Sequence, residues 1–150
     1  MSNVSLLRKL IFLKGSGTLV PGTVVLTGDA MAEMFVANTS SERWFPDDRY
    51  VTAYGGSSAG DKTYFNGIFK ENTQYVLSFT MYKASSTGTN IAVYYTDGTS
   101  EFLPSVETGV KQRKTLTTAA GKTVDYIGGK KQNNYLTRIY VDESKIYEKS

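Results

Sequence analysis

Residues 63–95, with the sequence TYFNGIFKENTQYVLSFTMYKASSTGTNIAVYY, decide the fold class of this chain. Large apolar side chains alternate with smaller or polar ones over residues 75–82, and residues 90–95 repeat the pattern. A period of two places successive side chains on opposite faces of a sheet, so both runs predict β-strands. Residues 84–89 between them are small, polar and include a glycine. We therefore predict two neighbouring antiparallel strands joined by an open loop.

Further short runs indicate strands on either side of this stretch, at spacings typical of all-β domains. We expect residues 114–118 to form a hairpin with 124–127, and residues 135–141 to pair with 145–147. Residues 30–36 fit either a helical turn or a strand. The predicted fold class is all-β, an antiparallel β-sandwich of the jelly-roll type with a short N-terminal arm or helix.

The composition excludes several classes of active site. The chain has 150 residues, of which 40% are hydrophobic and 13% aromatic, and these values suit one folded domain. It contains no cysteine and no histidine, which removes disulfides, thiol nucleophiles and the commonest general base. Asp47 and Asp48 are adjacent, so in a strand they would point apart and make a poor glycosidase pair. We predict a protein without enzymatic activity.

The charge pattern predicts neither a nucleic-acid nor a membrane partner. The formal net charge is +3, with basic residues gathered at Lys111, Arg113 and Lys114 and again at Lys130 and Lys131. Along the sequence these clusters lack the interleaved aromatic residues of a single-strand binder, so we interpret both as solvated surface. No apolar run approaches the roughly 20 residues of a membrane span.

The first 14 residues form a segment of their own. Their apolar side chains follow helical spacing in part, although residues 10–13 could equally form a short strand. Two interpretations stay open, a first element packed on its own core or an arm that docks on a neighbouring subunit. We divide the chain into a docking arm, 1–14, and a single β-sandwich domain, 15–150. The expected assembly contacts are Leu6, Leu7, Leu10, Ile11 and Leu13.

From about residue 64 onward the order of sequence signals resembles a known family. The signals are an aromatic–glycine–aromatic strand, further patterned strands, a tight turn and a closing Tyr-Val-Asp, found at residues 65–69, 72–79, 94–99, 120–121 and 140–142. This pattern is similar to the jelly-roll carbohydrate-binding modules, particularly the divergent copies in bacteriophage tail and head appendage proteins. The opening residues 3–10 also resemble the starts of small virion structural proteins.

The resemblance implies a sugar site and a metal site. In that family sugars stack on aromatic side chains across a sheet, and the expected residues here are Trp44, Tyr82 and Tyr94, because tyrosine and tryptophan rings offer an apolar platform with a polar edge. Asp142 matches an acidic residue that often helps to hold a structural Ca²⁺. The alternative interpretation is an aspartate in a surface loop, because a Ca²⁺ ion needs six to eight oxygen ligands and Asp142 is a single residue.

Two functions follow as expectations. The first is a non-enzymatic bacteriophage virion component in the tail, baseplate or head appendage, made in the host cytoplasm and located in the virion. Its partners would be other virion proteins, further copies of itself as a homo-oligomer, and a host surface glycan. The second is a stand-alone carbohydrate-binding module. No cofactor is expected beyond the Ca²⁺ that the resemblance implies.

Overall fold

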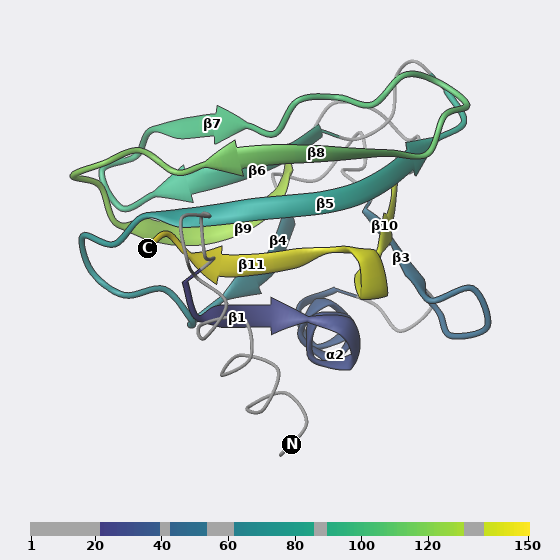
Figure 1. Cartoon of the computed structure of the whole chain (residues 1–150), viewed down its shortest axis with the longest axis horizontal. Helices are drawn as coiled ribbons and strands as arrows, with labels where there is room; N and C mark the ends of the chain where they lie inside the picture. Colours follow the sequence, from purple (N-terminus) through teal and green to yellow (C-terminus); the bar gives the residue numbers. More distant parts are fainter. Residues whose placement is uncertain (1–21, 40–42, 54–61, 86–89, 131–136) are drawn as a thin grey trace, which may run out of the picture.

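A computed structural model describes residues 22–39, 43–53, 62–85, 90–130 and 137–150. The described chain forms two antiparallel sheets with one α-helix beside them, which confirms the predicted β-sandwich (Figure 1). Its elements in chain order are β1 (Val24–Thr27), α2 (Gly28–Asn38), β2 (Trp44–Phe45), β3 (Tyr50–Ala53), β4 (Lys62–Asn66), β5 (Tyr75–Lys83), β6 (Asn90–Tyr95), β7 (Ser100–Phe102), β8 (Gln112–Thr117), β9 (Val124–Lys130), β10 (Thr137–Tyr140), the 3₁₀ turn η2 (Val141–Glu143) and β11 (Lys145–Glu148).

Strand β5 is the centre of the seven-stranded sheet. β8 pairs with one of its edges, and both β10 and β11 pair with the other. The sheet continues from β11 to β1, and from β10 through β3 to β2. Figure 1 shows β8, β5, β11 and β1 lying side by side in this order.

The turn η2 lets β10 and β11 lie end to end along one edge of β5. Ser144 Oγ accepts a hydrogen bond from the Thr80 backbone N–H at 3.0 Å, and Thr80 Oγ1 donates to the Glu143 carbonyl at 2.9 Å. These contacts satisfy backbone groups where the ladder is interrupted. The prediction that residues 135–141 pair with 145–147 is therefore wrong, because β10 and β11 each pair with β5.

The second sheet has four strands in the order β4-β9-β6-β7. β6 pairs with β9 and β7, so residues 75–83 and 90–95 lie in different sheets, and their predicted pairing is wrong. The predicted hairpin of 114–118 with 124–127 is wrong for the same reason, since β8 pairs with β5 and β9 with β4 and β6. Stacked sheets lie about 10 Å apart. A short polar loop can therefore connect two strands in different sheets as readily as two neighbouring strands of one sheet.

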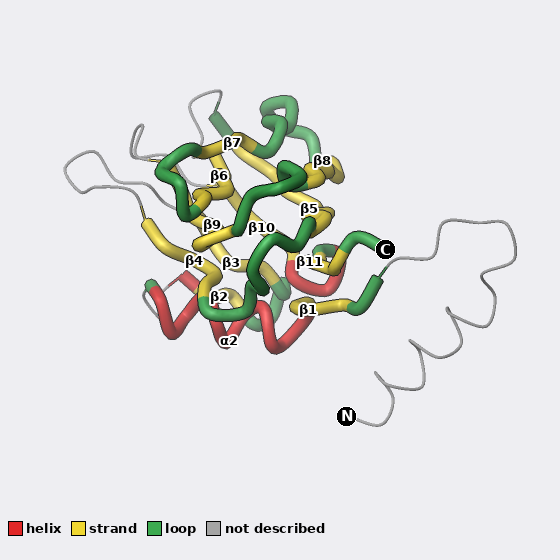
Figure 2. The backbone as a smooth tube through the Cα atoms, turned by 90° about the vertical axis from the view of Figure 1, so that its left-hand side faces the viewer, coloured by secondary structure: helices red, strands yellow, loops and turns green. Residues whose placement is uncertain are grey.

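The ambiguous segment 30–36 is helical and forms part of α2. Met31, Ala32 and Phe35 are buried, which is the spacing of one helix face. Helix α2 contacts β1 and β3 of one sheet and β4 of the other, so it closes one side of the sandwich (Figure 2). At 11 residues it is too short to cross a membrane, and no other described helix is long and apolar enough to do so.

The core fills the space between the two sheets and α2. Leu77 and Phe79 point inward from β5 and are fully buried, as are Val93 of β6 and Ile127 of β9. Phe65 of β4 meets Phe79 across the sheets with ring centroids 6.1 Å apart at 77°, an edge-to-face contact. The apolar alternation that predicted β5 therefore does face the core.

Truncating Leu77 should test this core directly. Leu77→Ala is expected to lower the free energy of unfolding by about 2–5 kcal/mol, because it removes buried methyl groups and leaves a cavity. Thr115→Ala is the control, since Thr115 is exposed on β8 and should change the value by about 0.5 kcal/mol or less. Urea unfolding followed by circular dichroism measures both. Equal effects of the two substitutions would contradict the inward orientation of Leu77.

Candidate functional site

A shallow groove of about 430 Å³ lies between α2 and the turn that follows β2. This volume is within the roughly 300–1,000 Å³ of typical small-molecule sites. The groove has a mostly apolar lining with three charged side chains, and its residues are Asp29, Ala32, Glu33, Val36, Ala37, Trp44, Pro46 and Arg49. One of the three residues predicted to bind sugar, Trp44, is thus part of it.

Local sequence explains how these side chains come together. Trp44 pairs with Val51 in the edge of the seven-stranded sheet and is half-buried. Pro46 begins the turn that leads to β3, where its fixed φ suits a chain reversal. Asp29 and Glu33 are four residues apart on α2, which places both on one side of the helix, and both are exposed.

Arg49 connects the groove to the rest of the fold. Its guanidinium contacts Asp29 Oδ1 at 2.6 Å and bonds both oxygens of Asp142 in η2 at 2.7 and 2.8 Å. The same guanidinium lies over the Trp44 ring at 5.4 Å from its centroid. Arg49 adopts φ 59°, an unusual value for a residue with a side chain, at the end of the turn before β3. One side chain therefore fixes the positions of α2, η2 and Trp44.

The electrostatics of this cluster favour the ionised forms. The hydrogen bonds from Arg49 lower the pKa of Asp142, and those to Asp142 and Asp29 raise the pKa of Arg49. The groove residues Asp29, Glu33 and Arg49, together with Asp142, which pairs with Arg49, comprise three carboxylates and one guanidinium. This cluster therefore carries more negative than positive charge.

The donor set around Asp142 does not fit the Ca²⁺ ion that the family resemblance implies. Both carboxylate oxygens accept hydrogen bonds from Arg49, whose positive charge would repel a divalent cation. Within the described part of the chain, no three Asp, Glu, His or Cys side chains converge as a metal site. The structure thus gives Asp142 a role in the ion pair with Arg49.

Tyr82, the second residue predicted to bind sugar, lies on the outer face of the seven-stranded sheet. Phe45, Tyr50 and Tyr140 form a row of aromatic rings on this face, with centroids 4.9 and 5.4 Å apart between successive rings. Tyr82 is opposite Arg138 of β10, and the Arg138 guanidinium lies over both Tyr50 and Tyr82. We call Phe45, Tyr50, Tyr82 and Tyr140 the aromatic face.

Tyr94, the third predicted residue, is on the opposite side of the molecule. It faces outward from the four-stranded sheet and stacks on Tyr126 of β9, with centroids 4.5 Å apart and planes at 13°. The exposed Phe102 belongs to the same sheet. The structure therefore places Trp44, Tyr82 and Tyr94 at three separate positions, and no single sugar site contains them all.

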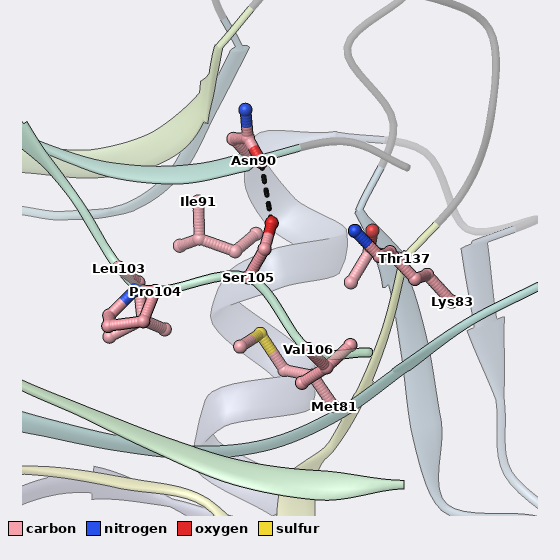
Figure 3. Close-up of a pocket in the computed structure, with 9 residues that line it drawn as sticks. All are labelled: Met81, Lys83, Asn90, Ile91, Leu103, Pro104, Ser105, Val106 and Thr137. Atoms are coloured by element: carbon pink, nitrogen blue, oxygen red, sulfur yellow. Dashed lines mark hydrogen bonds between the residues drawn. The ribbon is translucent and has the colours of Figure 1, made fainter. Parts of the chain in front are cut away.

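A smaller cavity lies between β5, β6 and the segment after β7 (Figure 3). Its volume is about 10 Å³, enough for at most about one water molecule. Ser105 Oγ donates a hydrogen bond to Asn90 Oδ1 across its rim at 3.1 Å. This space is too small for a sugar, so the groove at α2 is the better candidate.

Sequence reasoning missed Asp29, Glu33 and Arg49 as site residues. Their grouping depends on the helical state of 30–36, which the sequence left undecided, and on the return of β3 beside β2. The predicted assembly residues Leu6, Leu7, Leu10, Ile11 and Leu13 lie outside the described residues, so the docking arm stays a prediction.

Comparison with known proteins gives a partial likeness in fold. No family model matches the chain, and no curated protein matches it. The second N-terminal cellulose-binding domain of β-1,4-glucanase C from Cellulomonas fimi is 15% identical, with 86% of this chain and 96% of that chain covered and a TM-score of 0.49.

Two larger proteins match over part of their length. The CBM22-1–GH10 modules of xylanase 10B from Clostridium thermocellum, solved with xylohexaose, are 19% identical, with 67% of this chain covered and a TM-score of 0.42. AlgX from Pseudomonas aeruginosa is 12% identical, with 66% of this chain covered and a TM-score of 0.41. This chain spans only 21% and 26% of those two chains. None of the three is described as a bacteriophage protein.

The ion pair of Arg49 with Asp142 should make stability depend on pH. The pKa of Asp142 is lowered in the folded state, so its contribution is present above the unfolded pKa of about 3.9 and is lost as pH falls through the folded value. Asp142→Asn should be less stable than the parent at pH 7, and the difference should shrink in acid. Urea unfolding at pH 7 and near pH 3 measures this. An equal difference at both pH values would assign the effect to packing instead.

Proposed function

We propose that this domain binds a neutral carbohydrate in the groove between α2 and β2. The observation that carries the proposal is the combination of one half-exposed indole ring with two carboxylates and a guanidinium in a groove of about 430 Å³. Trp44 supplies an apolar surface for the C–H groups of a sugar ring. Asp29 and Glu33 can accept hydrogen bonds from sugar hydroxyl groups. The N–H groups of Arg49 that do not contact Asp29 or Asp142 can donate hydrogen bonds to sugar hydroxyl groups.

The charge balance of the groove supports a neutral rather than an acidic sugar. Glu33 is exposed at the groove, and it has no cation within salt-bridge distance among the described residues. Asp29 shares Arg49 with Asp142, so the guanidinium is already neutralised. A sugar carboxylate placed here would face repulsion without a free partner.

The groove suits binding without catalysis. Asp29 and Glu33 are both exposed to water, so neither carboxyl group of this groove has the desolvated setting that a general acid uses. Contact with Trp44 and fixed hydrogen-bond partners is sufficient for recognition.

The other function expected from the sequence is a bacteriophage virion component, and it stays a prediction. Its assembly contacts were assigned to residues 1–14, and its location in a virion rests on the sequence resemblance alone. Carbohydrate binding is compatible with that role, since a virion protein can contact a host surface glycan. Carbohydrate binding in the groove is a more specific proposal than the virion role, and it can be tested on the isolated chain.

A glycan array of neutral oligosaccharides, followed by isothermal titration calorimetry with the best ligand, tests the proposal. Trp44→Ala should weaken binding at least about tenfold, equivalent to about 1.4 kcal/mol, because the stacking surface is lost. Glu33→Gln should weaken it several-fold, and this exposed site poses little risk to folding.

Phe102→Ala is the matched control, since it removes an exposed aromatic side chain from the other sheet and should leave affinity unchanged. Thermal unfolding of each variant identifies a loss that comes from misfolding. Wild-type affinity in both Trp44→Ala and Glu33→Gln would exclude this groove as the site.

A further inference from the structure

We propose that the outer face of the seven-stranded sheet is a second binding site, and that it takes an acidic, carboxylate-bearing polysaccharide. This site is separate from the groove at α2 and does not depend on the function proposed for it. The proposal rests on how aromatic side chains from β2, β3, β5 and β10 meet cationic side chains from β8, β10, β11 and the residue before β8 on one face of the sheet.

The strand register places the aromatic residues side by side. Phe45 of β2 is opposite Tyr50 of β3, and Tyr50 is opposite Tyr140 of β10. Tyr82 projects from β5 on the same face, one row further along. The rings come from segments that are far apart in the sequence, from Phe45 near the start of the domain to Tyr140 near its end. In space, Lys111 of the first basic cluster therefore does have an aromatic neighbour, Tyr140.

Cations lie directly over these rings. The Arg138 guanidinium is 4.6 Å from the Tyr50 centroid and 5.1 Å from that of Tyr82. The Lys111 ammonium is 4.1 Å from the Tyr140 centroid. Cation–π contacts of this kind hold the charged groups against the sheet and restrict their motion, so a ligand meets them already positioned.

The face carries an excess of positive charge. Arg113 of β8 and Lys145 of β11 lie on the same face as Lys111 and Arg138. Arg113 is opposite Thr80 and Lys145 is opposite Ser78, and both of these β5 residues are on the outer face. Glu143 pairs with Lys111 at 2.8 Å. Among the described residues, the other three cations have no carboxylate within salt-bridge distance. These four cations and Glu143 together carry a net charge of +3, which is complementary to a polyanion.

The geometry favours an acidic glycan over single-stranded nucleic acid. A nucleic acid binds such a surface by stacking its bases on free ring faces, and here Arg138 and Lys111 occupy ring faces of Tyr50, Tyr82 and Tyr140. A uronate chain needs no free ring, because its carboxylates can pair with the guanidinium and ammonium groups in charge-assisted hydrogen bonds. Neither of the two cavities described above lies on this face, so an extended polymer fits better than a small molecule.

Binding to polygalacturonate and to alginate, measured by affinity electrophoresis and calorimetry, tests this inference. Wild-type protein should bind at least one of these polyuronates, more weakly as ionic strength rises, because exposed charges are screened over about 10 Å at 0.1 M salt. Fully methyl-esterified polygalacturonate has the same backbone without the charge and should bind at least tenfold more weakly.

The double variant Arg113→Gln with Arg138→Gln should lose at least tenfold in polyuronate affinity. Lys122→Gln is the matched control, since Lys122 also lies over a tyrosine ring, that of Tyr95 at 5.2 Å, but near the four-stranded sheet. It should bind polyuronate like the wild type. Thermal unfolding checks that the double variant is folded, and Arg138→Lys, which keeps the charge, should retain most of the affinity.

Three results would overturn the inference. They are no binding of either polyuronate by the wild-type protein, equal loss in the Lys122→Gln control, and tighter binding of poly(dT) than of polyuronate, which would indicate a nucleic-acid surface. None of these bears on Trp44, so neutral-glycan binding in the groove can succeed or fail separately.

Discussion

The backbone hydrogen bonds along both edges of β5 are the constraint on which the rest of the structure depends. β8 occupies one edge, and the consecutive strands β10 and β11 occupy the other. Leu77 and Phe79 are fully buried on the inner face, so a shift of one residue would move them to the outside and break the ladders with three strands together. The position of Arg138 on the outer face and that of Asp142 in η2 both follow from this register.

Local signals in the sequence were sufficient for most strands and insufficient for their partners. The alternation at residues 75–82 and 90–95 correctly predicts β5 and β6, and the tight turn expected within residues 94–99 leads to β7, with Gly98 at φ 89°. The same alternation cannot distinguish a hairpin from a crossing between stacked sheets, because both bury one face of each strand. The pairings of β5 with β6 and of β8 with β9 were wrong for this reason.

For the candidate site, too, the sequence was sufficient for one residue and insufficient for its partners. Trp44 could be selected from sequence, because an isolated tryptophan before Pro46 suggests a loop or strand end near the surface. Its partners could not be selected, since Asp29 and Glu33 reach it only through α2 and Arg49 only through an uncommon backbone conformation. The aromatic face was missed because Phe45 and Tyr50, on the adjacent strands β2 and β3, join Tyr82 of β5 only when the distant strand β10 pairs between β3 and β5.

The central position of the last strands has a consequence for biosynthesis. β11 separates β1 from β5, and β10 separates β3 from β5, so β1 has no partner strand and β3 has only β2 until residues 137–148 leave the ribosome. Until then β1 and β3 are exposed edges of the kind that promote aggregation. The sheet therefore closes in a late, concerted step that depends on contacts distant in sequence, and such topologies fold slowly for their size.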